Sequence, residues 1–197
     1  MQNEAVAAAS EPPFLLDGYS VKRLAADDLD DLQALHERCR DYFLLIEGGP
    51  PRPSSAEEDF SQTPPGKDQS DKFLLGIYSR GRELIAVLDL IRDHPAACDW
   101  WLGLLLLDPK SRGAGIGSRI YGAAQRWIAA QGGRVIYLAV LEQNVGAHRF
   151  WSAQGFKERR RSNFKAASGL ISGSIVMSQE IPRSPLRMRL SDGSERS

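Results

Sequence analysis

The segment that decides the fold of this chain is Leu104-Leu105-Leu106-Leu107-Asp108-Pro109-Lys110-Ser111-Arg112-Gly113-Ala114-Gly115-Ile116-Gly117-Ser118. Its four leucines form an apolar run without alternation, which is typical of a strand covered on both faces. Asp108 and Pro109 end that strand, and a helix begins near Gly115. Apolar residues recur one or two turns apart as far as Gln131, so one stripe of the helix faces a core. The segment therefore predicts a strand, a turn and a helix.

The turn between this strand and this helix is rich in glycine. Gly113, Gly115 and Gly117 carry no Cβ atom, so a ligand can approach their backbone closely. A helix N-terminus presents unpaired N–H groups and a partial positive charge, which together bind phosphate. Arg112 and Ser118 can add side-chain donors. The alternative is a tight turn that binds nothing, but three alternating glycines are costly at a helix start. The turn therefore predicts a diphosphate site.

Two common phosphate-binding motifs do not fit this turn. A nucleoside-triphosphate P-loop ends in Gly-Lys-Ser or Gly-Lys-Thr, whereas this chain has Gly117-Ser118-Arg119. A dinucleotide site requires the pattern G-x-G-x-x-G, and counting from Gly113 its last position is Ser118. A dinucleotide site also requires an acidic residue at the end of the strand that follows, but residues 137–140, at the end of that strand, are not acidic. Both classes of nucleotide-binding protein are therefore excluded.

The turn and the residues after it resemble the GNAT superfamily of N-acetyltransferases. The family signature is Arg or Gln, two residues, Gly, one residue, then Gly or Ala, and Arg112, Gly115 and Gly117 match it. The likeness continues through the family's second helix and closing Gly-Phe, at Asn144, Ala147, Phe150-Trp151 and Gly155-Phe156. In the order of elements it covers about residues 19–180.

Hydrophobic periodicity predicts the individual elements. Strands are expected at 19–24, 72–78, 83–91, 98–107, 135–140, 156–161 and 169–180, and helices at 27–39, 56–60, 115–131 and 144–154. The resemblance implies a single-domain α/β (α+β) fold, with a mixed sheet of about six to seven strands and helices on both faces. Its two central parallel strands, 100–107 and 135–140, would splay apart. The domain is expected to span residues 17–181, between a flexible arm (1–16) and a disordered tail (182–197).

The same resemblance implies acetyl-coenzyme A as co-substrate and direct attack of an amine on its thioester. Backbone N–H groups of the splayed strand would stabilise the oxyanion. The implied cofactor-binding residues are Leu105, Leu106, Leu107, Arg112, Gly113, Ala114, Gly115, Ile116, Gly117, Ser118, Asn144 and Trp151. For Asn144 the alternative is a plain helix N-cap, because Asn favours that position. No metal is expected, since no zinc or iron pattern exists.

The proton carriers usual in the family are missing. Its Tyr acid, seven residues after the Asn, is replaced by Trp151, whose indole cannot protonate a thiolate. Its Glu base, five residues before the Asn, is replaced by Ala139, and an earlier base position falls on or near Trp101. Asp99 and His148 are the candidate catalytic substitutes, and a solvated strand-start carboxylate and a surface histidine are their alternatives. Asp89, His36, His94 and bulk water are further candidates.

The resemblance places the acceptor pocket between residues 40–51, after the first helix, and residues 163–174, in the last strand pair. Tyr42, Phe43 and Trp100 are the candidate substrate-binding residues, with core packing as the alternative. The implied function is N-acetylation of a primary amine of a small molecule or a protein. A coenzyme A-binding regulatory or sensor domain is the alternative function, and the missing Tyr and Glu support it.

Composition narrows the class of partner. The chain has 197 residues, 42% of them hydrophobic, with 25 basic and 25 acidic residues and a formal net charge of zero. This balance gives no support for a nucleic-acid partner and argues against an acetyltransferase acting on aminoacyl-tRNA. Cys39 and Cys98 make no disulfide framework, and the apolar run at 100–107 is far shorter than the ~20 residues of a bilayer span. We therefore expect a cytoplasmic enzyme without a membrane partner, and a homodimer is compatible with the sequence.

Overall fold

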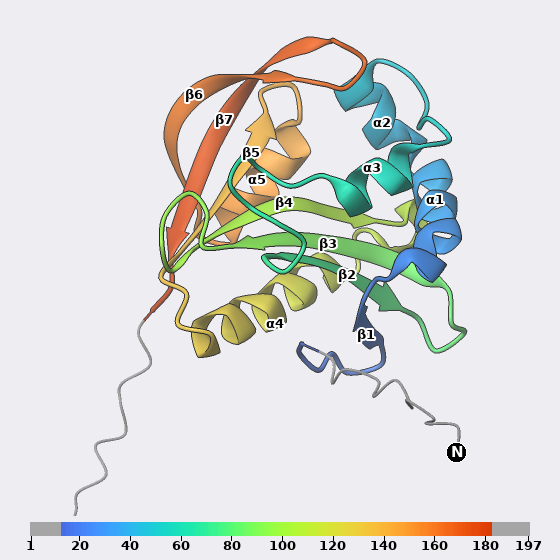
Figure 1. Ribbon diagram of the computed structural model, residues 1–197, viewed down its shortest axis with the longest axis horizontal. Helices are drawn as coiled ribbons and strands as arrows, with labels where there is room; N and C mark the ends of the chain where they lie inside the picture. The colour runs from blue at the N-terminus through green and yellow to red at the C-terminus, as the bar shows by residue number, and fades with distance from the viewer. Residues whose placement is uncertain (1–12, 183–197) are drawn as a thin grey trace, which may run out of the picture.

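One mixed sheet of seven strands organises the molecule in the computed structural model, which describes residues 13–182 (Figure 1). In chain order the strands are β1 (Ser20–Arg23), β2 (Lys72–Tyr78), β3 (Leu84–Arg92), β4 (Asp99–Leu107), β5 (Val135–Leu141), β6 (Lys157–Lys165) and β7 (Ile171–Glu180). Their spatial order is β1-β2-β3-β4-β5-β7-β6. Only β4 and β5 pair in parallel, and the other neighbours are antiparallel.

Five α-helices cover the sheet on both faces. They are α1 (Leu29–Arg38), α2 (Arg40–Glu47), α3 (Ser55–Ser61), α4 (Ile116–Ala130) and α5 (Val145–Ala153), and two short 3₁₀ turns, η1 (Ala26–Asp28) and η2 (Pro109–Ser111), precede α1 and α4. Helices α4 and α5 pack on one face, whereas α1, α2 and α3 cover the other (Figure 1). The β4–α4–β5 segment is the crossover that joins the two parallel strands, as a parallel pair requires.

Each face of the sheet has its own apolar core. Leu88, Trp100 and Ile120 belong to the larger core, between the sheet and α4. Leu35 and Val87 belong to the smaller core, between the sheet and the first three helices. Because side chains alternate along a strand, β3 supplies Val87 to one core and its neighbour Leu88 to the other. This two-sided burial explains why β3 and β4 read as apolar runs in the sequence.

The predicted fold class is confirmed, with seven strands, two parallel central strands and helices on both faces. Most predicted elements differ from the observed ones by one or two residues at their ends, and β6 extends four residues further than expected. Residues 40–47 were expected to be part of a connection, but they form helix α2. Phe14 and Leu16, inside the expected arm, are buried in the larger core. The rest of that arm, residues 1–12, and the predicted tail beyond Pro182 lie outside the described residues.

Candidate active site

The glycine-rich turn brings backbone N–H groups to the start of α4. Gly113 and Gly115 have φ values of 82° and 74°, a left-handed conformation that side-chain-bearing residues rarely adopt. Gly115 is the N-cap of α4, so the helix begins directly after it. A Cβ built on either glycine meets no atom within 4 Å. These two glycines are therefore required by backbone conformation, and the space beside them is open to a ligand.

The parallel strands β4 and β5 separate beside this turn. Their ladder contains three pairs, from Asp99 with Val135 to Trp101 with Tyr137. Further along β4, the N–H of Asp108 donates to Ile85 on β3. Since alternate residues of an antiparallel ladder point their backbone groups to the same side, those of Leu105 and Leu107 face the gap toward β5. The gap thus exposes a short strand edge next to the helix N-terminus.

The larger of two adjoining cavities, about 530 Å³ in volume, occupies this gap. Its lining combines the β4 edge, the glycine turn, the first turns of α5 and one side of α2: Asp41, Tyr42, Leu45, Leu105, Leu106, Leu107, Arg112, Gly113, Gly115, Ile116, Gly117, Ser118, Asn144, Gly146, Ala147, Phe150 and Trp151. Of the residues that the sequence predicted for the cofactor, Ala114 is not part of this lining. The structure thus gathers the other predicted residues around one space.

Asn144 lies at the start of α5 and lines the same cavity. Its Oδ1 accepts a hydrogen bond from the N–H of Ala147 at 3.0 Å, which is the N-cap interaction considered above. Within residues 13–182 no hydrogen bond engages its Nδ2. The side chain therefore caps the helix with one atom and offers the other to the cavity.

Arg112 bridges the glycine turn to α2. Its Nε donates to the carbonyl oxygen of Leu107 at 3.0 Å, and its guanidinium forms a bidentate ion pair with Asp41, with Nη2 to Oδ1 at 3.2 Å. The hydrogen bonds from Arg112 hold the pKa of the Asp41 carboxyl below its ordinary value, although partial burial opposes them. A negative charge therefore lies on the wall of the cavity, beside the residue best suited to bind a phosphate.

A second cavity, about 260 Å³ in volume, adjoins the first and shares Tyr42 with it. It is lined by Tyr42, Phe43, Ile46, Glu47, Arg52, Ser55, Glu58, Asp59, Gln62, Asp89, Gly103, Leu104, Phe164, Lys165 and Ala167. Helices α2 and α3, strands β3 and β4, and the β6–β7 hairpin all contribute. Four carboxylates and two basic groups line the space, so the cavity attracts cations.

Asp59 is the carboxylate of this cavity with the most perturbed ionisation. Burial raises its pKa to about 7, and the negative charge of Asp89 adds to the rise while Lys72 opposes it. Its Oδ2 lies 3.3 Å from Nε2 of His36, whose ring is fully buried. Burial lowers the pKa of His36 to about 4, so its imidazole is neutral at pH 7. In the described part of the chain, neither His36 ring nitrogen meets hydrogen-bond geometry.

Asp89 lies deeper in the same cavity, at an irregularity in the sheet. It pairs with Leu104, whereas the next residue, Leu90, pairs with Leu102, so Gly103 is an extra residue that bulges from β4. A Cβ on Gly103 would lie 2.8 Å from Oδ2 of Asp89, so only glycine leaves room for this carboxylate. Lys72 Nζ donates to the same oxygen at 3.0 Å. Burial raises the pKa of Asp89, and Lys72 opposes that rise.

The structure separates the predicted substrate-binding residues. Tyr42 lines both cavities, and Phe43 lines the second and also packs against the His36 ring. Trp100, in contrast, is 1% exposed and packs against Phe73 and Trp127 in the larger core. Of the three aromatic residues, the two on α2 therefore face the cavities.

The two predicted catalytic substitutes lie outside both cavities. Asp99 is the first residue of β4 and pairs with Val135, six residues before the exposed strand edge at Leu105. His148 is on α5, where its Nε2 lies 2.7 Å from Oε1 of Glu158. Asp89, one of the further candidates, lines the second cavity instead. The spacing arguments for Asp99 and His148 rested on sequence neighbours, which do not fix the direction of a side chain.

Asp59 was missed by the sequence analysis, because it lies in a proline-rich segment without a motif. Its importance depends on contacts with α1, α2, β2 and β3, which come from distant parts of the chain. The sequence signal that pointed to this segment was weak. It was a predicted short helix at 56–60 inside a long connection, and long connections are often functional.

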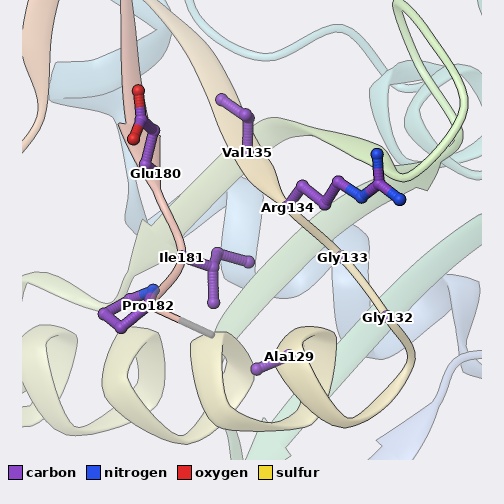
Figure 2. Close-up of a pocket in the computed structure, with 8 residues that line it drawn as sticks. All are labelled: Ala129, Gly132, Gly133, Arg134, Val135, Glu180, Ile181 and Pro182. Atoms are coloured by element: carbon purple, nitrogen blue, oxygen red, sulfur yellow. The ribbon is translucent and has the colours of Figure 1, made fainter. Parts of the chain in front are cut away.

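A third cavity, about 780 Å³ in volume, lies at the other end of α4 (Figure 2). It is lined by Ala129, Gly132, Gly133, Arg134, Val135, Glu180, Ile181 and Pro182. Figure 2 shows the side chains of Arg134 and Glu180 pointing away from each other. The 15 residues of α4 separate this space from the glycine turn by about 22 Å, so it is not part of the candidate active site.

Two further observations concern metals and membranes. Among residues 13–182, no group of three or more His, Cys, Asp or Glu side chains is arranged to hold a metal ion. No helix in the same part of the chain has the length and apolar character that crossing a bilayer requires.

Solved structures that share this fold include several N-acetyltransferases. The Escherichia coli ribosomal-protein-S18-alanine N-acetyltransferase has a TM-score of 0.61 at 16% identity, over 86% of this chain and 98% of that one. The Vibrio cholerae spermidine N-acetyltransferase, in complex with CoA and spermine, has a TM-score of 0.64 at 16% identity, over 84% of this chain and 97% of that one. The Thermoplasma acidophilum PaiA N-acetyltransferase, in complex with coenzyme A, has a TM-score of 0.58 at 18% identity, over 82% of this chain and 98% of that one.

At these identities the structural likeness shows the fold, and sequence evidence must show the family. No curated protein matches the chain significantly. The family model of the acetyltransferase (GNAT) family matches residues 29–156. This range includes the glycine turn, the helices that line the two adjoining cavities, and the splayed strands β4 and β5. The chain therefore belongs to the GNAT family of acetyltransferases, whose members use acetyl-coenzyme A.

Proposed function

We propose that this chain transfers the acetyl group of acetyl-coenzyme A to a primary amine of a small molecule or a protein, by direct attack in a ternary complex. The observation that carries this proposal is the meeting of two cavities at Tyr42. The larger cavity borders β4 at residues 105–107, and the smaller one borders it at Gly103 and Leu104. A thioester in the first and an amine in the second would be neighbours, which removes much of the entropic barrier.

The groups that line the larger cavity support coenzyme A as its ligand. Its volume of about 530 Å³ lies in the range of ligand pockets. The open space at Gly113 and Gly115 gives a diphosphate access to the N–H groups at the start of α4. The backbone of Leu105 and the N–H of Leu107 can pair with an extended pantetheine arm, as a strand edge pairs with a peptide, while the carbonyl oxygen of Leu107 already accepts from Arg112. When bound, the cofactor supplies an acetyl thioester.

The smaller cavity supports a compact cationic amine as the acceptor. Its volume of about 260 Å³ equals roughly nine waters at about 30 Å³ each, enough for the reacting end of an amine. The four carboxylates Glu47, Glu58, Asp59 and Asp89 outnumber the two basic groups on this lining, and Asp59 is partly ionised at pH 7. The resulting excess of negative charge would draw in an ammonium group and hold it near Leu104 on β4.

Thiol release with a panel of amines tests the proposal. Acetyl-coenzyme A is incubated with the protein and 1,4-diaminobutane, a lysine-bearing peptide or glutamate, and free thiol is measured over time. We expect release with at least one cationic amine, at a rate on the order of tenfold or more above that with glutamate, because the cavity repels carboxylates. Binding of coenzyme A without release from any amine would contradict the proposal.

The second candidate function is that of a coenzyme A-binding regulatory or sensor domain. The observation that favours it is the presence of Trp151 and Ala139 where the family usually has its Tyr and Glu. This candidate predicts that calorimetry detects coenzyme A binding while the amine panel releases no thiol.

A further inference from the structure

We propose that Tyr42 and Asp59 are the proton donor and the proton acceptor of acetyl transfer in this chain. The inference rests on the function proposed above and assigns the two roles left open by Trp151 and Ala139. Both residues come from the segment between α1 and β2, and both line the acceptor cavity. The proton carriers would thus have moved from the β4–α5 half of the molecule to helices α2 and α3.

Among residues 13–182, Tyr42 is the only one that brings an aromatic hydroxyl to the lining of either cavity, and it borders both of them. Burial raises the pKa of its phenol above the ordinary value, and the charges of Asp59 and Glu47 add to this rise. Tyr42 therefore stays protonated at neutral pH. The raised pKa makes this phenol a weaker acid, so the assignment rests on its position, which borders both cavities and places it to give a proton to a sulfur that departs from the larger one.

Asp59 is distinguished from the other carboxylates of the cavity by its partners. Glu47 accepts from the N–H of Ser168 at 2.8 Å, Glu58 accepts from Arg52 and Ser54, and Asp89 accepts from Lys72. Asp59 accepts no hydrogen bond from any described residue, and its nearest basic group is the neutral His36. Its side chain is 41% exposed, and this surface lines the cavity, so its oxygens are free to meet an amine.

The ionisation of Asp59 suits a base that works at neutral pH. A pKa of about 7 makes the carboxylate and the acid comparably populated there, which is the condition for efficient proton transfer. The charged and titratable groups that face it from the surrounding elements are His36 on α1, Tyr42 and Glu47 on α2, Glu58 on α3, Lys72 on β2 and Asp89 on β3. The acidic members of this set keep the pKa high, and Lys72 limits the rise.

The bound ammonium first loses one proton to solvent in the cavity, which leaves a neutral amine. The lone pair of this amine forms the new C–N bond at the acetyl carbon, and an Asp59 oxygen takes the second proton from nitrogen. The C–S bond breaks with its electron pair on sulfur, and sulfur takes the Tyr42 phenol proton. Asp59 then returns a proton to the Tyr42 phenolate through solvent in the cavity. The products are an amide, a free thiol and one proton released to solvent, and both side chains regain their starting states.

Four variants test the assignment: Tyr42→Phe and Asp59→Asn, with Tyr19→Phe and Glu57→Gln as matched controls outside the cavities. We expect kcat to fall on the order of 10²-fold or more in each of the first two and to stay within twofold in the controls. The dissociation constant of coenzyme A, measured by calorimetry, should change little in all four. In the wild type, kcat/KM should rise about tenfold per pH unit below about pH 7 and level off above it, since the ionised form of Asp59 is the base.

A readout independent of turnover is the titration of Asp59 by ¹³C NMR of the carboxyl carbon, which should give a midpoint near pH 7. Wild-type turnover with unchanged kcat in Asp59→Asn or Tyr42→Phe would overturn the assignment and leave the proposed function standing. A midpoint near pH 4 would also overturn it. Absence of wild-type turnover with every amine would overturn both.

Discussion

At the scale of single residues, His36 and Asp59 lie 3.3 Å apart, and their pKa shifts affect stability in opposite directions. The folded pKa of Asp59, about 7, lies above the ordinary 3.8, so the folded state binds its proton more tightly than the unfolded chain does. This contribution to stability is present at low pH and is lost as pH rises toward 7. The folded pKa of His36, about 4, lies below 6.5, so its contribution is lost as pH falls through that interval.

The first prediction concerns Asp59→Asn. At pH 8 the wild type carries a partly desolvated charge at this position that the variant lacks, so the variant should melt at a higher temperature. Because the side chain is 41% exposed and solvent screens its charge, we expect a difference of only about 2–4 °C, which corresponds to roughly 1 kcal/mol in a domain of this size. At pH 5 the difference should shrink, because Asp59 is then protonated in the wild type. Thermal unfolding at both pH values, with Glu57→Gln as control, measures it, and an equal or lower melting temperature at pH 8 would refute it.

At the scale of elements, α2 is the wall that the two cavities share. One side of the helix presents Asp41 and Leu45 to the larger cavity, the other presents Phe43 and Glu47 to the smaller one, and Tyr42 borders both. The β6–β7 hairpin holds the end of the helix through Glu47. The position of α2 therefore determines the shape of both spaces at once.

The second prediction concerns the ion pair between Asp41 and Arg112. Asp41→Asn should tighten coenzyme A binding by about three- to fivefold, because it releases the guanidinium for phosphate and removes a negative charge from the cavity wall. Unfolding stability should change by less than about 1 kcal/mol, since both partners are partly exposed. Calorimetry at low salt measures the effect, with Asp30→Asn on α1 as a charge-matched control. Weaker binding would show instead that the pair orders α2 around the ligand.

The sequence predicted some of these elements much better than others. Strand β4 and helix α4 were predictable because the buried run at 104–107 and the glycine turn are local signals. The separation of β4 from β5 followed only from the family resemblance, since hydropathy does not encode strand pairing. Helix α2 was not predicted, because only Cys39 separates it from α1, and no glycine or proline marks the boundary. The bulge at Gly103 was also not predicted, as an isolated glycine in a strand has several explanations.

The candidate site also has one half that the sequence could predict and one half that it could not. Its cofactor half lies on one contiguous stretch, residues 104–118, and on the start of α5, so a local pattern could identify it. Its acceptor half joins α2, α3, β3, β4 and the β6–β7 hairpin, which meet only in the folded chain. Tyr42 was found through the family's acceptor region, and Asp59 was not found at all. The energetic feature that distinguishes Asp59, its desolvation, arises from packing that no local pattern records.

At the scale of the whole molecule, the sheet separates two cores, and the larger one extends away from the active site. Gly133 lies beside Trp100 and Ile128 in that core, and a Cβ there would come 2.9 Å from the Trp100 indole. Neither the Trp100 nor the Ile128 side chain is a flexible polar chain end that could move aside. The packing around Gly133 must therefore shift to admit a Cβ atom.

The third prediction follows from this crowding. Gly133→Ala should lower the free energy of unfolding by about 1–3 kcal/mol, the usual cost of overpacking. Coenzyme A affinity should be unchanged, because α4 keeps the two ends about 22 Å apart. Denaturant unfolding and calorimetry on the same variant measure the two quantities. If the folded Gly133→Ala variant bound coenzyme A more weakly than the wild type, this core would not be separate from the cofactor cavity.

The fold also supplies a matched pair of positions for the fourth prediction. Gly115 and Gly132 flank the two ends of α4, with φ values of 74° and 82°, and a Cβ on either meets no atom within 4 Å. Alanine should therefore cost a similar amount at both, about 1–2 kcal/mol of left-handed strain. Only Gly115 lies where the diphosphate would approach the backbone.

The most direct measurement is therefore a calorimetric titration of coenzyme A into the wild type, Gly115→Ala and Gly132→Ala under conditions where all three are folded. We expect the wild type and Gly132→Ala to bind with the same affinity, and Gly115→Ala to bind at least tenfold more weakly, a loss of about 1.4 kcal/mol. No binding to the wild type, or equal affinity in the two variants, would contradict the claim that the backbone of residues 112–117 holds the cofactor.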